Sequence, residues 1–203
     1  TGVLSFTSAP DYETKSSYSA IVTANDGFLT GSLDITVNVT NVNDNNPSFT
    51  SSATFSAAEN QTAIGTVTAT DAEGDSVTFT VSGSELAITS AGVLTFKAAP
   101  DYETKSSYTA TVTASDGTNT STQDIMVNVT DVDEIAPVIS VTSGTDTVEL
   151  GATWTDAGAT ADGGETVTTS GSVDTSTVGT YTITYSATDA SGNTSSETRT
   201  VTV

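Results

Sequence analysis

The chain has 203 residues, and its four basic and 25 acidic residues give a net charge of −21, with no histidine and no cysteine. This charge repels nucleic-acid phosphates and anionic lipid, which excludes nucleic-acid binding. Thr, Ser, Val and Gly dominate, as in short strands and tight turns, so we expect small all-β domains. No disulfide can brace such domains, and a bound cation is the obvious alternative.

Apolar runs of membrane-spanning length and secretory signal features are absent from the sequence, so we expect no membrane insertion in this segment. With the half-repeat described next, this pattern favours an internal fragment of a longer protein.

One segment occurs twice, because Gly2–Asp44 returns almost unchanged as Gly92–Glu134. Further strand-like runs precede the second copy, so we expect one complete repeat at 47–134 and only the C-terminal half of a repeat at 1–44. Such a half would leave an apolar face and a sheet edge open. Either the fragment begins arbitrarily, or another chain supplies the missing strands by β-augmentation. The preceding runs are Thr50–Ala57, Gly65–Ala69, Ser76–Val81 and Leu86–Thr89.

Apolar and polar side chains alternate with a period of two over Tyr18–Ala24 and Leu33–Val39, which predicts half-buried strands. Glycines punctuate these runs, and the repeat suits a seven-stranded antiparallel sandwich. The fold class we predict is therefore all-β, with tandem antiparallel β-sandwiches.

The repeat stops after Pro137, yet strand patterns continue to the end of the chain, so we expect a third, shorter sandwich at 137–203. Trp154 is expected as a large core residue, and Asp189–Asn193 as the last hairpin turn. The expected strands are Val138–Val141, Thr145–Leu150, Val167–Ser170, Thr180–Ala187 and Ser196–Val203.

Acidic and amide side chains gather at strand ends and at domain boundaries. A dense set of oxygen ligands suits Ca²⁺ better than Mg²⁺, which retains water, and zinc or copper would lack nitrogen and sulfur donors here. Calcium is therefore the predicted cofactor. The clusters are Pro10–Glu13 and Pro100–Glu103, Asp26-Gly27 and Asp116-Gly117, Asp71–Asp75, and the boundary segments Asn41–Pro47 and Asp131–Pro137.

These motifs resemble those of the cadherin repeat family over residues 1–137, and the Asn/Asp boundary segment before proline is the most specific of them. Glu73 departs from the family's Asp, and Asp133-Glu134-Ile135 departs from its Asn-Asp-Asn. The matching residues are Ala58-Glu59-Asn60, Asp71 and Glu73, Asp101 and Glu103, Asp116, and Asn43 to Asn45, with Asp11, Glu13 and Asp26 in the truncated copy.

The resemblance implies that each junction gathers calcium ligands from both neighbouring repeats, with fewer ions at the second junction. The implied ligands of the first junction are Asp11, Glu13, Asn43, Asp44, Asn45, Asp71, Glu73 and Asp116. Those of the second are Glu59, Asp101, Glu103, Asp131, Asp133 and Glu134.

Residues 137–203 resemble a bacterial surface-protein immunoglobulin-like domain through Asp156–Asp162, Gly171–Thr175, Gly179–Tyr185 and Ala187–Asn193. Its pairing with cadherin-like repeats resembles a large bacterial adhesin, which implies an extracellular or cell-surface location.

Three functions follow as hypotheses. The first is a calcium-binding, calcium-rigidified spacer or adhesion rod of a bacterial surface adhesin or filament. The second is direct homophilic or host-receptor adhesion, and the third is an accessory module of a secreted polysaccharide-degrading enzyme. Expected partners are neighbouring repeats of the same protein and, if the half-repeat is completed in trans, another chain. We expect no catalysis, because the acidic pairs recur in each copy and no histidine or cysteine is present.

Overall fold

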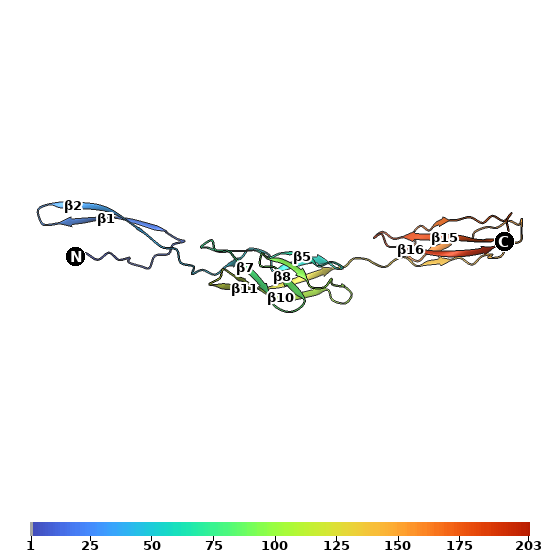
Figure 1. Cartoon of the computed structure of the whole chain (residues 1–203), viewed down its shortest axis with the longest axis horizontal. Helices are drawn as coiled ribbons and strands as arrows, with labels where there is room; N and C mark the ends of the chain where they lie inside the picture. The colour runs from blue at the N-terminus through green and yellow to red at the C-terminus, as the bar shows by residue number, and fades with distance from the viewer. Residues whose placement is uncertain (1) are drawn as a thin grey trace. The chain divides into compact units, whose positions relative to one another are not determined.

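The structure is a computed structural model that describes residues 2–203. Within that range all regular elements are strands, which confirms the predicted all-β class (Figure 1). A membrane-spanning helix is accordingly not found among these residues. The chain divides into two compact units, Thr1–Asp131 and Val132–Val203, which we describe one at a time.

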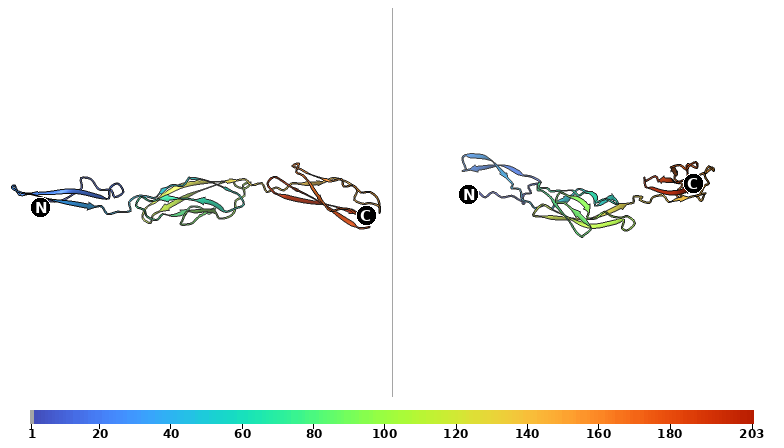
Figure 2. Two further views of the ribbon diagram at one scale, coloured as in Figure 1. Left: turned by 90° about the horizontal axis from the view of Figure 1, so that it is seen from above. Right: turned by 45° about the vertical axis from the view of Figure 1, so that its right-hand side comes forward.

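The first unit begins with a hairpin of β1 (Ser17–Asn25) and β2 (Thr30–Asn38). The two strands pair antiparallel from Ser17↔Asn38 to Asn25↔Thr30, as their alternation predicts. Gly27 adopts a φ of 93° in the turn, a conformation that favours glycine. In both views of Figure 2 no second sheet covers this hairpin.

Residues 48–130 form the complete repeat, whose strands lie in two layers (Figure 2). One sheet has the order β4-β11-β10-β7, a second has the order β5-β9-β8, and β3 and β6 form a short separate pair. The strands are β3 (Ser48–Phe49), β4 (Thr54–Ala58), β5 (Ala63–Thr66), β6 (Ala69–Thr70), β7 (Thr78–Val81), β8 (Leu86–Ile88), β9 (Val93–Phe96), β10 (Ser107–Ser115) and β11 (Thr120–Thr130).

One pair in this repeat departs from the antiparallel pattern, because β4 runs parallel to β11 from Thr54↔Met126 to Ala58↔Thr130. Parallel neighbours need a long crossover, and here the whole intervening repeat provides it. The pair therefore ties the beginning of the repeat to its last strand.

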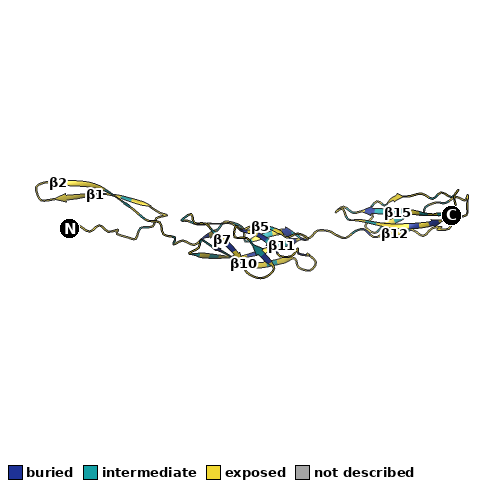
Figure 3. Cartoon of the chain, viewed as in Figure 1, coloured by how far each residue is buried: buried dark blue, intermediate teal, exposed yellow. Residues whose placement is uncertain are grey.

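The core of the repeat lies between the two layers, and it joins residues before Gly92 to residues after it. Figure 3 shows buried positions on β10 and β11, whereas the equivalent strands β1 and β2 are largely exposed. The buried apolar residues of the repeat are Ala57, Val67, Phe79, Leu86, Leu94, Phe96, Val112, Ala114, Ile125, Val127 and Val129.

The second unit is a smaller set of strands: β12 (Ile139–Val141), β13 (Ala159–Ala161), β14 (Thr168–Ser170), β15 (Thr180–Thr188) and β16 (Thr194–Thr202). They form the pair β12-β13 and the sheet β14-β15-β16. The predicted strand at Thr145–Leu150 is reduced to one bridge, Thr147↔Thr202, and β13 was not predicted.

Tyr185 is the largest fully buried side chain of the second unit, and Trp154, expected as a large core residue, packs against the same core. Trp154 is only partly buried against the core, and its indole N–H donates to the carbonyl of Thr145 at 2.8 Å. The edge of the core is therefore closed by an aromatic residue with a polar contact.

Arg199 is a buried cation in the second unit, with 5% of its surface exposed. Its guanidinium lies 3.2 Å from Asp156 and 3.4 Å from Asp146, and it also donates to the carbonyl of Thr142. Tyr185 donates to Asp156 at 2.5 Å. Burial alone would raise the pKa of Asp156, but the bonds from Tyr185 and the Gly158 N–H and the charge of Arg199 outweigh it and lower that pKa.

Candidate functional site

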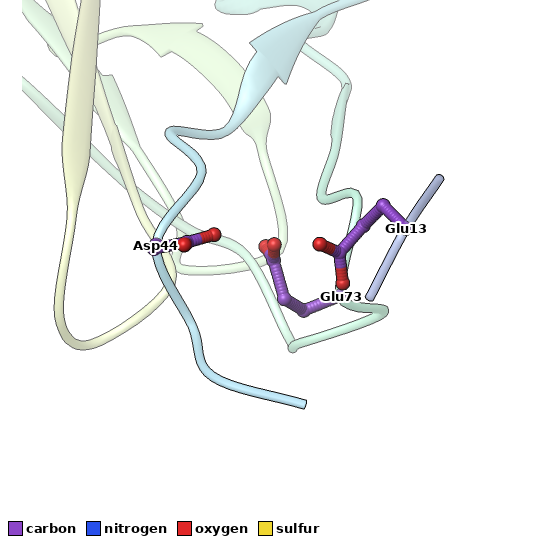
Figure 4. A group of neighbouring side chains, drawn as sticks. All are labelled: Glu13, Asp44 and Glu73. Carbon is purple, nitrogen blue, oxygen red and sulfur yellow. The ribbon is translucent and has the colours of Figure 1, made fainter. Parts of the chain in front are cut away.

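Three carboxylates from distant parts of the first unit converge where the half-repeat meets the complete repeat (Figure 4). Glu13 lies in the loop before β1, Asp44 in the linker, and Glu73 in the loop after β6. Each contributes an oxygen, and these oxygens all lie within 4.8 Å of one another. Such crowding of like charges is unfavourable without a compensating cation.

Two carboxylate oxygens at this cluster are buried without a hydrogen-bond partner, Asp71 Oδ2 and Glu73 Oε2. The other oxygen of each group is engaged. Asp71 Oδ1 accepts the backbone N–H groups of Glu73 at 3.0 Å and Asp75 at 3.1 Å, and Glu73 Oε1 accepts from the side-chain amide of Asn45. Leaving a buried carboxylate oxygen unpaired is costly, so these two oxygens need a partner that the hydrogen bonds above do not supply.

Crowding also affects the protonation of Glu13. Desolvation raises the pKa of this carboxyl, and the negative charge of Glu73 adds to the increase. The nearby Asp11 behaves in the opposite way, because its carboxylate closes a turn. Donation from the Thr14 hydroxyl at 2.9 Å, together with the Thr14 and Glu13 N–H groups, lowers the pKa of Asp11.

Amide side chains hold the linker against the complete repeat. The amide of Asn43 donates to Asp75 Oδ2 at 2.9 Å. The amide of Asn119, in the β10–β11 loop, donates to Asn43 Oδ1 at 2.5 Å and to the carbonyl of Asn45 at 3.0 Å. The linker is therefore attached to two loops of the complete repeat, the one after β6 and the one between β10 and β11.

Asp116 shapes the loop that carries Asn119. Its Oδ1 accepts the N–H groups of Thr118 and Asn119, both at 2.7 Å. Desolvation would raise the pKa of Asp116, but these N–H groups outweigh it, and the pKa is lowered. Asp116 thus stays ionised beside the linker.

A second group of carboxylates lies at the other end of the same repeat. Oxygens of Glu59, Glu103 and Asp131 lie within 4.8 Å of one another. Glu59 is 3% exposed, and its Oε2 accepts the N–H of Tyr102 at 2.7 Å. The parallel pairing of β4 with β11 positions it, because Glu59 follows β4 directly and its N–H donates to the carbonyl of Thr130 at 3.1 Å.

Asp101 repeats the local role of Asp11 at this second group, since its Oδ1 accepts the N–H of Thr104 at 2.9 Å. Asp133 and Glu134 belong to the second unit. There Asp133 accepts from the Ser191 hydroxyl at 2.9 Å, and its carbonyl accepts from the amide of Asn193 at 2.9 Å.

Sequence reasoning did not single out two further polar residues, Asn119 of the first unit and Asp189 of the second. Asp189 accepts the N–H groups of Ser191 and Asn193 just as Asp116 accepts those of its own loop, yet it was assigned only to a turn. The signal was present, because Ala187-Thr-Asp189 has the pattern of Ala114-Ser-Asp116. Asp75 was named within the cluster Asp71–Asp75 but not as a ligand, and Asn119 was not named at all.

The structure thus gathers Glu13, Asp44 and Glu73 at one end of the complete repeat, and Glu59, Glu103 and Asp131 at the other. Asp71, Asn43, Asn45 and Asp116 surround the first group through the contacts above, whereas Asp11 and Asp101 close turns. That any of these residues is a metal ligand stays a prediction.

Two family models match the chain. Residues 43–130 match a family described as "Bacterial Ig domain", and residues 139–203 match "Bacterial surface protein, Ig-like domain".

Curated relatives with similar sequence are cadherins. Human "Cadherin EGF LAG seven-pass G-type receptor 2" is 36% identical over 153 residues, which is 68% of this chain and 5% of that protein. Human "Protocadherin Fat 4" is 36% identical over 128 residues, which is 56% of this chain and 3% of that protein. The chain therefore spans only a small part of the relatives it matches.

Solved cadherin structures share the fold. The protocadherin GammaB4 extracellular domain superposes with a TM-score of 0.58 at 21% identity, over 96% of this chain and 38% of that one. Mouse cadherin-23 EC22-24 gives a TM-score of 0.52 at 20% identity, over 97% and 77%. At these identities the likeness shows the fold alone.

The chain therefore combines a cadherin-like repeat with a bacterial immunoglobulin-like domain, as the sequence motifs predicted. These domains indicate an extracellular surface or adhesion module.

Proposed function

We propose that this chain is a calcium-binding, calcium-rigidified extracellular spacer or adhesion rod of a bacterial cell-surface adhesin or filament. The observation that supports it most is the pair of buried, unpartnered carboxylate oxygens of Asp71 and Glu73 beside the crowded acids Glu13 and Asp44.

The donor set fits calcium. Its groups are carboxylates, side-chain amides and backbone carbonyls, and the chain contains no histidine or cysteine. Ca²⁺ takes about six to eight such oxygens in flexible geometry, whereas Mg²⁺ requires near-ideal octahedra and retains water. Glu13, Asp44, Asp71 and Glu73 would hold the ion, and its charge would offset the repulsion among these crowded carboxylates.

The ion would make the junction rigid because its ligands belong to different parts of the first unit. Glu13 belongs to the half-repeat, Asp44 to the linker and Glu73 to the complete repeat, so one ion bound to all three would resist their separation. Binding to the ordered junction alone stabilises it by mass action, about 2.7 kcal/mol when free calcium is about 100 times the Kd. Extracellular modules commonly bind calcium at about 10⁻⁴–10⁻³ M.

The second group of carboxylates extends the proposal along the chain. Glu59, Glu103 and Asp131 would form the corresponding site at the other end of the complete repeat. Glu59 is buried, which is unusual for an acid and increases the benefit of a neighbouring cation.

Direct adhesion is favoured by one observation, the exposed apolar face of the β1–β2 hairpin, which we interpret below as an incomplete core. No geometry specifically favours a role as an accessory module of a polysaccharide-degrading enzyme.

The test is calcium calorimetry on the full chain and on Glu73→Gln, which keeps the shape of the side chain but removes its charge. We expect saturable binding at millimolar calcium or tighter, weakened about tenfold or more in the variant, which corresponds to about 1.4 kcal/mol. Thermal scans should show a calcium-dependent rise in the melting temperature of the first unit, and small-angle scattering should show reduced flexibility with calcium.

Asp34→Asn is the matched control, because Asp34 is an exposed acid on β2 outside both groups and its loss changes the net charge equally. If calcium gives no heat, or if both variants bind like the parent chain, the acids are solvated surface and the proposal fails.

A further inference from the structure

The β1–β2 hairpin carries an uncovered apolar face. Leu4 and Phe6 run beside it, and together with Ile35 and Val37 they line a groove of about 380 Å³. Leu4 is 64% exposed and Phe6 42%. Val22 on β1 is 46% exposed. Isolated two-stranded hairpins are marginally stable at best, so this face needs a covering element.

The complete repeat shows what covers the same residues. Leu4, Phe6, Val22, Ile35 and Val37 have identical counterparts in the second copy. The counterparts are Leu94 (0% exposed), Phe96 (3%), Val112 (0%), Ile125 (2%) and Val127 (0%).

The cover over these counterparts comes from residues 47–91. Ala57, Val67, Phe79 and Leu86 are buried in one cluster with them, and Phe49 and Phe55 pack against that cluster. The apolar residues of the second copy are thus half of a core whose other half lies within residues 47–91.

A glycine supplies independent support. Gly92 has a φ of 87°, and a Cβ there would clash with the backbone oxygen of Val67. Its counterpart Gly2 is also glycine, yet a Cβ at Gly2 would meet nothing within 4 Å. At Gly92 both the positive φ and the overlying backbone oxygen of Val67 require glycine, whereas neither feature is present at Gly2, so nothing within this chain explains the glycine there.

We propose that the apolar face of the hairpin is the docking surface for the front half of a repeat of the same type, a β-segment with the strand pattern of residues 47–91. Such a segment supplies the apolar residues that complete the core and the backbone that makes glycine necessary at position 2. A second hairpin would supply apolar contact but no counterpart of the Val67 backbone. The inference does not rest on cation binding.

The first experiment adds a separate polypeptide of residues 47–91, labelled with a fluorophore, to the full chain. We expect saturable binding, followed by anisotropy, that Ile35→Asp weakens at least about tenfold. Ile21→Asp is the matched control, because Ile21 lies on the opposite face of the hairpin, where the second copy has Thr111. The control should bind like the parent chain.

The second experiment removes any dependence on the solubility of the separate segment. Residues 47–91 are placed directly before Gly2 of the full chain, and hydrogen exchange of β1 and β2 is measured. We expect exchange at least about 100-fold slower than in the parent chain and comparable to that of β10 and β11. Gly2→Ala should lower the melting temperature of the extended chain and leave that of the parent chain unchanged.

Unchanged exchange in the extended chain would overturn the proposal, whatever the separate segment does. Sedimentation of the parent chain provides the other decisive outcome. If it forms a dimer that Ile35→Asp dissociates, the occupant of the face is a second copy, and the proposal is wrong.

Discussion

The two copies of the repeated segment, residues 2–44 and 92–134, share their local contacts. The rings of Phe6 and Tyr18 meet edge to face at 5.0 Å, as do those of Phe96 and Tyr108. Lys15 lies 4.5 Å from the ring centre of Tyr18, and Lys105 lies 4.3 Å from that of Tyr108. Hairpin register and the aspartate-closed turn also recur.

Burial separates the copies. Leu94 is fully buried, whereas Leu4 is 64% exposed, although both begin the same Leu-x-Phe pattern. The comparison teaches that the segment itself encodes its local conformation, but the burial that stabilises it depends on residues 47–91.

The two copies also differ in the loop of the hairpin, between β1 and β2 in the first copy and between β10 and β11 in the second. Asn119 ties its loop to the linker through two amide hydrogen bonds, whereas the first copy has Leu29, which is 76% exposed. The same hairpin therefore carries a polar attachment in one copy and an apolar tip in the other.

Truncation of the equivalent residues Leu94 and Leu4 should give the largest difference in stability between the two copies. Leu94→Ala should destabilise the complete repeat by about 3 kcal/mol, because it opens a cavity in a packed core. Leu4→Ala should cost less than about 0.5 kcal/mol, because the side chain is already exposed. Urea unfolding followed by hydrogen exchange of β1 and β10 separates the two effects. Equal costs would show that Leu4 is also covered in solution.

The second unit sharpens the comparison, because its small apolar core is accompanied by a buried ion pair of Arg199 with Asp156. Asp156→Asn should destabilise it by about 2 kcal/mol, less than the usual cost of breaking a buried pair because Arg199 retains Asp146 and the Thr142 carbonyl. Asp146→Asn, at a side chain 62% exposed, should cost less than about 1 kcal/mol. Urea unfolding followed by Trp154 fluorescence reports both.

The lowered pKa of Asp156 predicts that the stability of the second unit depends on pH. This pKa is lower in the folded state than in the unfolded state, so the stabilising contribution of the carboxylate is present above the unfolded value and is lost as pH falls through the folded value. The second unit should therefore lose stability below about pH 4, and Asp156→Asn should flatten that loss. Parallel pH profiles for parent and variant would contradict the assignment.

Exchanging the loop residues gives the smallest expected effect. Asn119→Leu should loosen the linker by about 1 kcal/mol, because it removes the bonds to Asn43 and Asn45. Leu29→Asn should change stability by less than about 0.5 kcal/mol. Hydrogen exchange of residues 43–46 measures the first, and unchanged exchange there would mean that Asn119 does not hold the linker.

Period-two patterns predicted β1 and β2 because each alternation is complete within one strand. The parallel pairing of β4 with β11 could not be predicted, since nothing local to Thr54–Ala58 specifies a partner at the other end of the repeat. β13 was missed because Ala159–Ala161 is short and is flanked by glycine and aspartate.

In the candidate sites, too, local patterns could be predicted from the sequence, but long-range contacts could not. Pairs such as Asp11 and Glu13 are visible in sequence, but only the fold separates their tasks, with Asp11 closing a turn and Glu13 facing Glu73. Asn119 could not be found by comparing copies, because the first copy has leucine there. Asp189 was assigned to a turn, and it does close one, so the turn signal concealed its likeness to Asp116.

The buried guanidinium of Arg199 also bears on the survival of such a chain among secreted proteases. Trypsin-like enzymes cleave after lysine or arginine, and this chain has only four such positions. One of them, Arg199, lies within β16 with its side chain held by two carboxylates, so cleavage there requires the second unit to open first. At a fixed protease concentration, the rate of digestion at that bond should consequently report the opening equilibrium of the second unit.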